Sequence, residues 1–399
     1  LRSPINAAGA ESLSVLILRR IIGSTIRLAP KQSTSGEPKF KGNSKVGPTG
    51  CFHEERIQGV SRALRILIIG GTGIISTGIT RLLIERGDDV VLYNRGLRPS
   101  LVEGAYTFIT GDRKEYASFE NQVQEAGAFD CVIDMVCYLP EEAESALRAF
   151  KGRTGQYIFC STVDVYTKPA AAYPITEAAE RKPSRAFPYA YNKACCEELL
   201  FAAHERGDLV VTSIRPGHTY GEGGNNLLHA LGRGNYHLDR LKKGQPIIVH
   251  GNGTSFWPTC HRDDVSVAFV GAIGNEKAKG RGYHVAGEEW MTWEGYHQGL
   301  AKAIGAKEPE FVYIPTDVLV RMVPQEAALC EVNFHYNNLF DNTAAREDLG
   351  FRVTIPWVEG ARRTVKWLEE NGKLEMSTDF YDRIITTWRQ ATGNLTIES

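Results

Sequence analysis

A glycine-rich turn between an apolar strand and an amphipathic helix is the feature that most restricts the fold of this chain. The β-branched run Arg65–Ile69 predicts a strand. Beyond the turn, apolar residues recur at helical spacing until Gly87, and residues 90–93 predict a second strand. Strand, turn, helix and strand make a βαβ unit, which implies a parallel sheet.

Later apolar runs extend this sheet. Residues 131–136, 157–160 and 209–214 are continuously apolar, as is typical of parallel strands covered on both faces. The predicted fold class is therefore α/β, with a doubly wound parallel sheet of the Rossmann type. From Gly217 onward the sequence becomes rich in Gly, Asn and His, with one return to strand-like sequence at 281–285. This change predicts a smaller, interleaved C-terminal substrate domain.

The expected organisation has four parts. They are an extension at 1–61, a nucleotide-binding Rossmann domain at 62–216 and 262–285, a substrate domain at 217–261 and 286–380, and a C-terminal tail at 381–399. In the extension, Glu11 and Glu37 are the only acidic residues before Glu54. Such a composition fits a disordered segment, and it equally fits a targeting segment for import into an organelle.

The overall composition excludes several classes of partner. With a formal net charge of -1, the chain has no whole-molecule field that would draw it to nucleic acid or to a membrane surface. No apolar stretch near the N-terminus approaches the ~20 residues of a membrane span. Cysteine and histidine lack paired ligand spacing, so no metal is predicted. We expect a small-molecule substrate, no nucleic acid, and an intracellular, cytoplasmic protein, with organellar import as the alternative.

The glycine-rich turn predicts a dinucleotide site. Glycine allows a pyrophosphate to approach the backbone, and free N–H groups at the helix N-terminus meet its charge. The residues expected to do this are Gly70, Gly71, Thr72, Gly73, Ile74 and Ile75. Ser76 stands where a third glycine is usual, and the alternative interpretation is an ordinary tight turn.

The end of the second strand indicates which dinucleotide binds. An NAD site normally offers a carboxylate there, whereas this chain has Asn94 and Arg95. A guanidinium can pair with a 2′-phosphate, so NADP is the expected cofactor and NAD the alternative; a solvated loop arginine would indicate neither. Asp112 is placed to hydrogen-bond the adenine, or else is an exposed turn residue.

Two further segments predict proton chemistry. Tyr189 and Lys193 are spaced i, i+4 on a predicted helix, and a neighbouring cation favours the phenolate, which suits a general acid/base. Ser161 and Thr162 follow an apolar strand, so their hydroxyls are expected at the carboxyl edge of the sheet, where ligands bind. Thr162 is the expected substrate-orienting hydroxyl and Ser161 the alternative, unless either bonds only to the loop backbone.

Taken in order, these motifs and the run Arg-Pro-Gly-His-Thr-Tyr-Gly at 215–221 resemble the extended short-chain dehydrogenase/reductase family, the NAD-dependent epimerases and dehydratases. The resemblance covers about residues 65–372. It implies that Tyr189 exchanges a proton with a substrate hydroxyl while hydride moves to or from the nicotinamide. Lys193 would hold the ribose and tune Tyr189, Thr162 would bind the same substrate oxygen, and Pro216 would lie beside the nicotinamide.

The resemblance also implies roles around the substrate. Asp164 matches an acid/base of the dehydratase branch, with a plain turn aspartate as the alternative, and we expect Ser161, Arg215 and His218 to contact substrate. The expected reaction interconverts hydroxyl and carbonyl on a sugar nucleotide or related polyol, by epimerisation, elimination or net reduction, in a possible homodimer. The alternative is a non-catalytic nucleotide-binding or RNA-binding protein of the same fold, because this branch includes a chloroplast RNA-binding relative.

Overall fold

The structure is a computed structural model that describes residues 62–97, 101–224, 226–232 and 234–393. The predicted extension at 1–61 lies outside the described residues. From Ala63 onward the described chain belongs to one compact unit.

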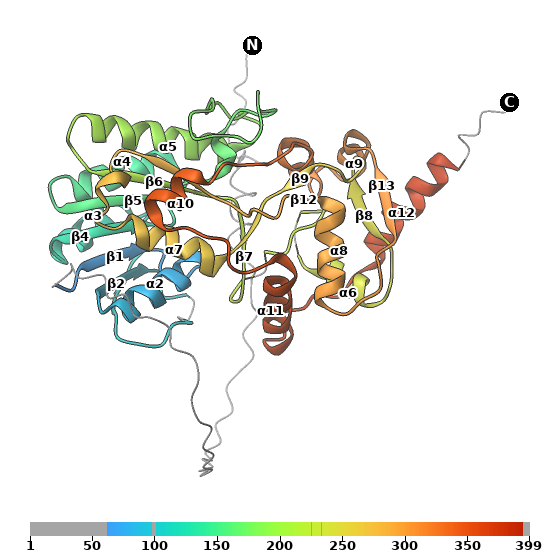
Figure 1. The fold of residues 1–399 in the computed structure, drawn as a ribbon, viewed down its shortest axis with the longest axis horizontal. Helices are drawn as coiled ribbons and strands as arrows, with labels where there is room; N and C mark the ends of the chain where they lie inside the picture. The colour runs from blue at the N-terminus through green and yellow to red at the C-terminus, as the bar shows by residue number, and fades with distance from the viewer. Residues whose placement is uncertain (1–61, 98–100, 225, 233, 394–399) are drawn as a thin grey trace, which may run out of the picture. The chain divides into compact units, whose positions relative to one another are not determined.

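A seven-stranded parallel sheet organises the first part of this unit, which we call the sheet lobe (Figure 1). The strand order is β11-β6-β5-β4-β1-β2-β3. From β1 the chain adds β2 and β3 on one side, and it then crosses over to add β4, β5 and β6 on the other side, as in a doubly wound fold. The predicted fold class is confirmed. The strands are β1 (Arg65–Ile69), β2 (Asp89–Asn94), β3 (Thr107–Thr110), β4 (Phe129–Asp134), β5 (Thr154–Cys160), β6 (Val211–Pro216) and β11 (Gly282–Val285).

Helices cover both faces of the sheet, because each buried strand sends alternate side chains to opposite sides. Ile66 and Ile68 of β1 pack with one group of helices, whereas Leu67 and Ile69 pack with the other. The first group is α2 (Ile74–Arg86), α7 (Arg262–Ala272) and α10 (Thr343–Leu349), and the second is α3 (Tyr116–Glu125), α4 (Pro140–Phe150) and α5 (Pro188–Glu205). The continuous apolar runs of the sequence are explained by this double coverage.

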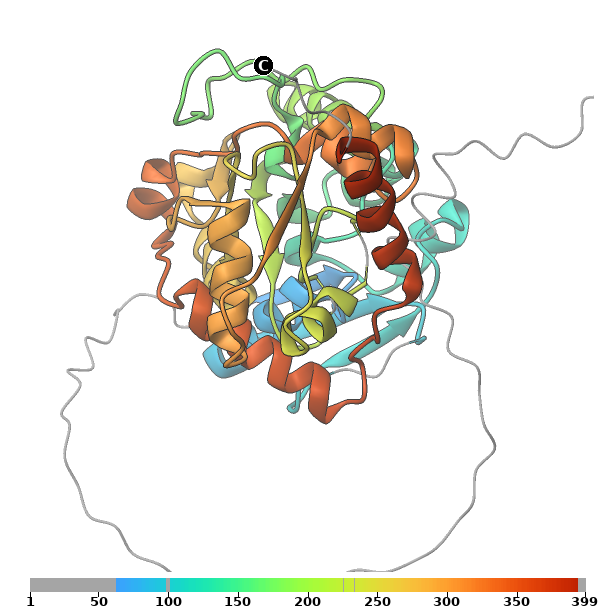
Figure 2. The ribbon, with the colours of Figure 1, turned by 90° about the vertical axis from the view of Figure 1, so that its right-hand side faces the viewer.

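A separate core around Trp293, Tyr296 and Trp357 defines what we call the second lobe. The ribbon of this lobe faces the viewer in Figure 2. Its helices are α6 (Tyr236–Lys242), α8 (Trp293–Ala303), α9 (Thr316–Met322), α11 (Trp357–Glu370) and α12 (Asp379–Thr392). Its strands are β8 (Ile247–His250) with β13 (Phe311–Ile314) and β9 (Phe256–Trp257) with β12 (Met291–Thr292), while β7 (His218–Tyr220) pairs with β10 (Thr259–His261). The described residues also form three short helical turns: η1 (Val163–Val165), η2 (Glu276–Ala278) and the π-helical η3 (Cys330–Phe334).

Two parts of the predicted domain division were wrong. Residues 381–392 are not a tail but most of helix α12, because Tyr381, Ile384 and Ile385 are buried in the second core. Helix α10 was assigned to the substrate domain, yet its buried Ala345 and Leu349 pack in the same core as α2 and α7. Among the described residues, no helix is both long and apolar enough to cross a membrane.

Candidate active site

The glycine-rich loop lies close against its neighbours at the carboxyl end of β1. Gly70 has a φ of +86°, and a Cβ there would lie 2.5 Å from Cγ1 of Val136. A Cβ on Gly71 would lie 2.6 Å from Cδ2 of Leu92. Only glycine fits either position without displacing a neighbouring side chain, so the loop backbone packs closely against Val136 and Leu92.

Ser76 closes this loop in place of a third glycine. Its Oγ accepts a hydrogen bond from the Gly73 N–H (2.7 Å) and donates to the Gly70 carbonyl (2.8 Å). The first intrahelical bond of α2 runs from the Thr77 N–H to the Gly73 carbonyl (3.0 Å). The N–H groups of Ile74 and Ile75 precede that bond, and this is the arrangement that receives a phosphate at a helix N-terminus.

Donor groups gather where β2 ends. Arg95 is about half exposed, and its Nη1 lies 4.0 Å from Oδ2 of Asp112. The Nδ2 of Asn94 is buried without a hydrogen-bond partner among the described residues. Oδ1 of Asp112 accepts from the Lys114 N–H (3.0 Å). A buried amide without a partner is a group that a bound ligand could satisfy. The neighbouring residues 98–100 lie outside the described chain.

Tyr189 stands in the first turn of α5, beside the residues that follow β5. Burial raises the pKa of Tyr189 well above its usual value, the nearby Tyr138, Cys160 and Asp164 raise it further, and a side-chain hydrogen bond with Thr162 lowers it. Tyr189 therefore holds its proton at neutral pH. This arrangement favours a proton donor over a phenolate base.

The Lys193 ammonium, which was expected to activate Tyr189, contacts other groups in this structure. Its Nζ donates to the Cys160 carbonyl (2.6 Å) and lies 4.6 Å and 4.8 Å from the ring centroids of Tyr138 and Phe159. The side chain is 1% exposed. In this structure the Lys193 ammonium contacts a carbonyl and two ring faces, so its role in tuning the pKa of Tyr189 stays a prediction.

The two hydroxyl residues that follow β5, Ser161 and Thr162, contact different neighbours. Thr162 caps η1, its Oγ1 accepting from the Asp164 N–H (3.2 Å), and it is the hydroxyl that meets Tyr189. Ser161 is 2% exposed and lies beside the buried Glu197. Asp164 pairs with Lys168, Oδ1 to Nζ being 3.0 Å. Of the two alternatives, Thr162 is the one placed beside the phenol.

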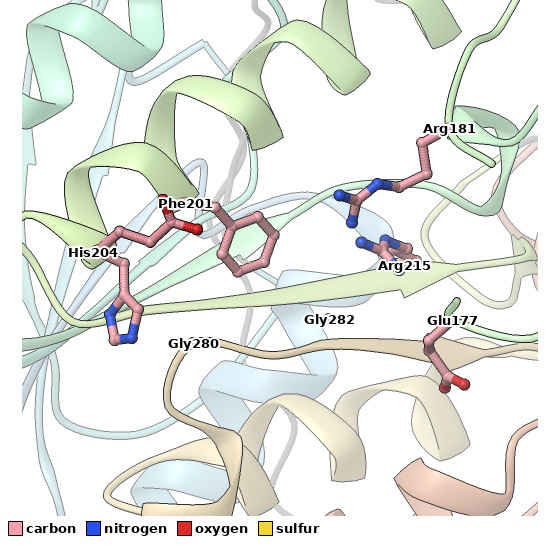
Figure 3. A pocket seen from close by; sticks show the side chains of 8 residues that line it. Glu177, Arg181, Phe201, His204, Arg215, Gly280 and Gly282 are labelled. Carbon is pink, nitrogen blue, oxygen red and sulfur yellow. The ribbon is translucent and has the colours of Figure 1, made fainter. Parts of the chain in front are cut away.

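Arg215 is not available to a substrate. Its Nε and Nη2 each lie 2.8 Å from an oxygen of Glu197, and Nη1 donates to the Tyr166 hydroxyl (2.7 Å). The predicted substrate role of Arg215 was wrong, because this buried fork holds β6 to α5. The guanidinium borders a cavity of about 250 Å³ (Figure 3), which contains none of the expected catalytic side chains; it is lined by Glu177, Arg181, Phe201, His204, Glu205, Arg215, Gly280 and Gly282.

Pro216 and His218 lie at the carboxyl edge of the sheet: Pro216 is the last residue of β6, and His218 begins β7 two positions later. Nε2 of His218 lies 2.6 Å from the Asn226 carbonyl and so carries the proton, which leaves Nδ1 as an acceptor. That Nδ1 is buried with no partner in the described parts of the chain. Burial lowers the pKa of His218 to about 4. A neutral imidazole with an unused acceptor suits a hydroxyl-bearing ligand. Pro216 ends β6 opposite Val285.

One cluster contains residue types that often bind metals, but its side chains are already paired with each other and with arginines. Glu222, His261 and Asp263 bring possible ligand atoms within 4.8 Å of one another. His261 uses both nitrogens, Nδ1 accepting from the Asp263 N–H (3.2 Å) and Nε2 lying 3.2 Å from Glu222. Arg363 pairs with both carboxylates and Arg81 with Asp263. The group is a charge network joining α2, α7 and α11.

Sequence reasoning missed two features of the site region. Lys168 pairs with Asp164 and also donates a hydrogen bond to Asn338, which is 170 positions away in the sequence. No local sequence pattern could reveal that contact. Gly78 brings α2 against α7, since a Cβ there would lie 2.3 Å from Oγ of Ser266. An isolated glycine within a helical pattern was a usable signal for such a close approach.

The doubly wound sheet, the glycine-rich loop at its edge and the Thr162–Tyr189 contact define an extended short-chain dehydrogenase/reductase. The chain belongs to the NAD-dependent epimerase/dehydratase family, whose model matches residues 66–286.

Individual relatives differ in what they do. The chain is 32% identical to the chloroplast stem-loop binding protein of 41 kDa b of Arabidopsis thaliana, over 80% of this chain and 78% of that protein. It is 27% identical to 2′-dehydrokanamycin reductase of Streptomyces kanamyceticus, over 70% and 77%. Its fold matches UDP-glucose 4-epimerase of Bifidobacterium longum, solved with NAD+ and UDP, at a TM-score of 0.60 and 18% identity, over 77% of this chain and 99% of that one.

Proposed function

We propose that this protein is an NADP(H)-dependent oxidoreductase that acts on a hydroxyl or carbonyl centre of a sugar nucleotide or related polyol. The observation that carries the proposal is the contact between Tyr189 and Thr162 at the carboxyl end of β5. Because β1, β4 and β5 are adjacent and parallel, this contact lies at the same sheet edge as the glycine-rich loop. A proton donor and a nucleotide cradle thus share one edge.

The cofactor would be held by backbone and side-chain donors. The loop from Gly70 to Ile75 would receive the pyrophosphate, Arg95 and Asn94 the ribose 2′-phosphate, and Asp112 the adenine. Pro216 would lie beside the nicotinamide, and Lys193 would reach the neighbouring ribose. When bound, the nicotinamide supplies or accepts the hydride. The absence of a carboxylate at Asn94 supports NADP over NAD.

The proton would come from Tyr189. Since its pKa is raised, the phenol is protonated at neutral pH and can donate to a carbonyl oxygen as hydride arrives at the carbon. Thr162 would hydrogen-bond that oxygen and fix its position. A protonated phenol fits the reduction of a carbonyl, and one relative is named as a reductase. His218 Nδ1 would accept a hydrogen bond from a substrate hydroxyl.

The direct test is substitution of Tyr189→Phe. With NADPH and a panel of keto sugars and sugar nucleotides, followed at 340 nm, we expect the variant to lose at least about a hundredfold in kcat, the usual contribution of a positioned general acid. Tyr191→Phe, on the same helix, is the matched control and should keep its rate. Full turnover by the Tyr189 variant would contradict the assignment.

A second candidate function is RNA binding, favoured by the name of the stem-loop binding relative. Phosphate contacts would make binding of a stem-loop RNA steeply dependent on salt; a flat or absent response would rule this candidate out. The chloroplast relative and the basic residues of 1–61 also support organellar import. A homodimer stays a prediction from the family resemblance.

A further inference from the structure

An ammonium group, that of Lys168, is buried where the loop after β5 meets the second lobe. The side chain of Lys168 is 6% exposed, and its Nζ lies 3.0 Å from Oδ1 of Asp164. From the second lobe, Nζ donates to Oδ1 of Asn338 (2.8 Å) and to Oδ1 of Asn333, a residue of η3. The Asn338 amide is itself fixed, because its Nδ2 donates to the Tyr336 carbonyl (3.0 Å).

These contacts use the whole hydrogen-bonding capacity of the ammonium. A lysine Nζ has three donors, and three side-chain oxygens accept them. Burial lowers the pKa of Lys168 and the charge of Asp164 opposes that shift. No donor is left for a substrate. Lys168 therefore acts through its protein partners and not by touching the reacting atoms.

The partner nearest the reaction is Asp164. One carboxylate oxygen is paired with Lys168, and the other lies 3.4 Å from Oγ1 of Thr162, the hydroxyl that contacts Tyr189. The Asp164 carboxylate thus lies between the Lys168 ammonium and the Thr162 hydroxyl. These contacts fit a positioning role, while the acid/base role that the family resemblance implied stays a prediction.

We propose that Lys168 is a positioning residue that joins the second lobe to the loop after β5 and fixes Asp164. The backbone N–H of Asp164 donates to Oγ1 of Thr162 (3.2 Å), so this residue orients the Thr162 hydroxyl and leaves its proton for the substrate oxygen. The orienting role rests on the proposed function, while the joining of the lobes does not. Lys182, further along the chain, differs from Lys168: its side chain is 79% exposed and pairs with Glu180.

The test is hydrogen exchange followed by mass spectrometry on the full chain, with and without NADPH. Lys168→Met is compared with Asp164→Asn, with the double variant and with the control Lys182→Met. We expect Lys168→Met to speed exchange by about tenfold or more at both 160–166 and 330–338, since breaking a buried ion pair releases both attached segments. The control should match wild type. Because Lys168 acts through Asp164, the double variant should exchange at 160–166 no faster than Lys168→Met alone.

Two outcomes would overturn the proposal: unchanged exchange at 330–338 in Lys168→Met, or additive effects of the two single changes at 160–166. If Lys168→Met does not fold, Asn338→Ala removes one acceptor and is judged by exchange at the same two segments. NADPH binding, titrated in parallel, separates the two proposals: a wild-type protein that binds no NADPH counts against the proposed function, whereas the exchange results alone decide the role of Lys168.

Discussion

Individual polar side chains around the site are held by buried partners from distant parts of the chain. Arg215 and Glu197 are each 1% exposed and pair through two hydrogen bonds, while Lys168 is enclosed by oxygens from both lobes. Buried charges in such pairs are costly to separate. Residues that a sequence motif assigns to substrate can therefore serve the scaffold.

Replacing Arg215 tests this interpretation. Arg215→Met leaves the Glu197 carboxylate buried without its main partner, so we expect a loss of about 3–5 kcal/mol in the free energy of unfolding, measured with urea. Arg321→Met breaks an exposed pair with Asp317 and should cost less than about 1 kcal/mol. NADPH affinity should be unchanged in both. A stable Arg215 variant that loses ligand binding would restore the substrate role.

The local part of the site could be predicted from sequence, and the long-range part could not. The glycine turn and the Tyr189–Lys193 spacing are short patterns whose geometry follows from a strand edge and a helix face. The direction of the Lys193 side chain depends on Tyr138, in the loop before α4, and on the Cys160 carbonyl at the end of β5. No pattern within one segment reveals those neighbours.

At the scale of elements, the buried strands were the easiest to predict, because coverage on both faces makes them continuously apolar. The edge strand β3 was missed: its residues are mostly exposed, so it carries no apolar run. Helix α12 was missed because only one of its sides packs against the second core, and the residues on its other sides are mostly polar. Both elements were missed because many of their residues are exposed to solvent, so the sequence lacks a clear apolar pattern there.

Gly78 offers a test of how α2 packs on α7. Alanine normally stabilises a helix interior by about 1 kcal/mol relative to glycine. Gly78→Ala should instead destabilise the protein by about 1–3 kcal/mol, because the new methyl group would overlap Ser266, which is buried and bonded to the Arg262 carbonyl. Urea unfolding gives the value. Adding Ser266→Gly should recover most of the loss.

The matched control is Gly295→Ala in α8. A Cβ at that position would meet its neighbours at 3.5 Å or more, an ordinary contact. This variant should be neutral or slightly stabilised. If Gly78→Ala behaves like the control, the two helices are less closely packed than the structure indicates.

For the whole molecule, buried neutral histidines make stability depend on pH. Burial lowers the pKa of His218 and His250 to about 4 and of His284 and His297 to about 3. In the unfolded chain the same groups bind protons below about 6.5. The unfolded state therefore binds more protons between these values, and stability falls as the pH drops from about 6.5 toward 4, each histidine contributing up to about 1.4 kcal/mol per pH unit.

Urea unfolding at pH 7.5, 6.5, 5.5 and 5.0 measures this slope. Above pH 5 most carboxylates stay ionised in both states, so histidine dominates the change. His297→Phe should reduce the slope by about one proton. Constant stability from pH 7.5 to 5.0 would mean that these imidazoles are hydrated or paired in solution.

The central claim, a nicotinamide cofactor held at the edge of the sheet with its phosphate on Arg95, is tested most directly by nucleotide titration. Purified protein is titrated with NADPH, NADP, NADH and NAD and followed by fluorescence, beside Arg95→Ala and the control Arg321→Ala. We expect NADP(H) to bind at least about tenfold more tightly than NAD(H), and Arg95→Ala alone to abolish that preference, because a charge-assisted pair is lost. Failure of the wild-type protein to bind any of the four nucleotides would contradict the account.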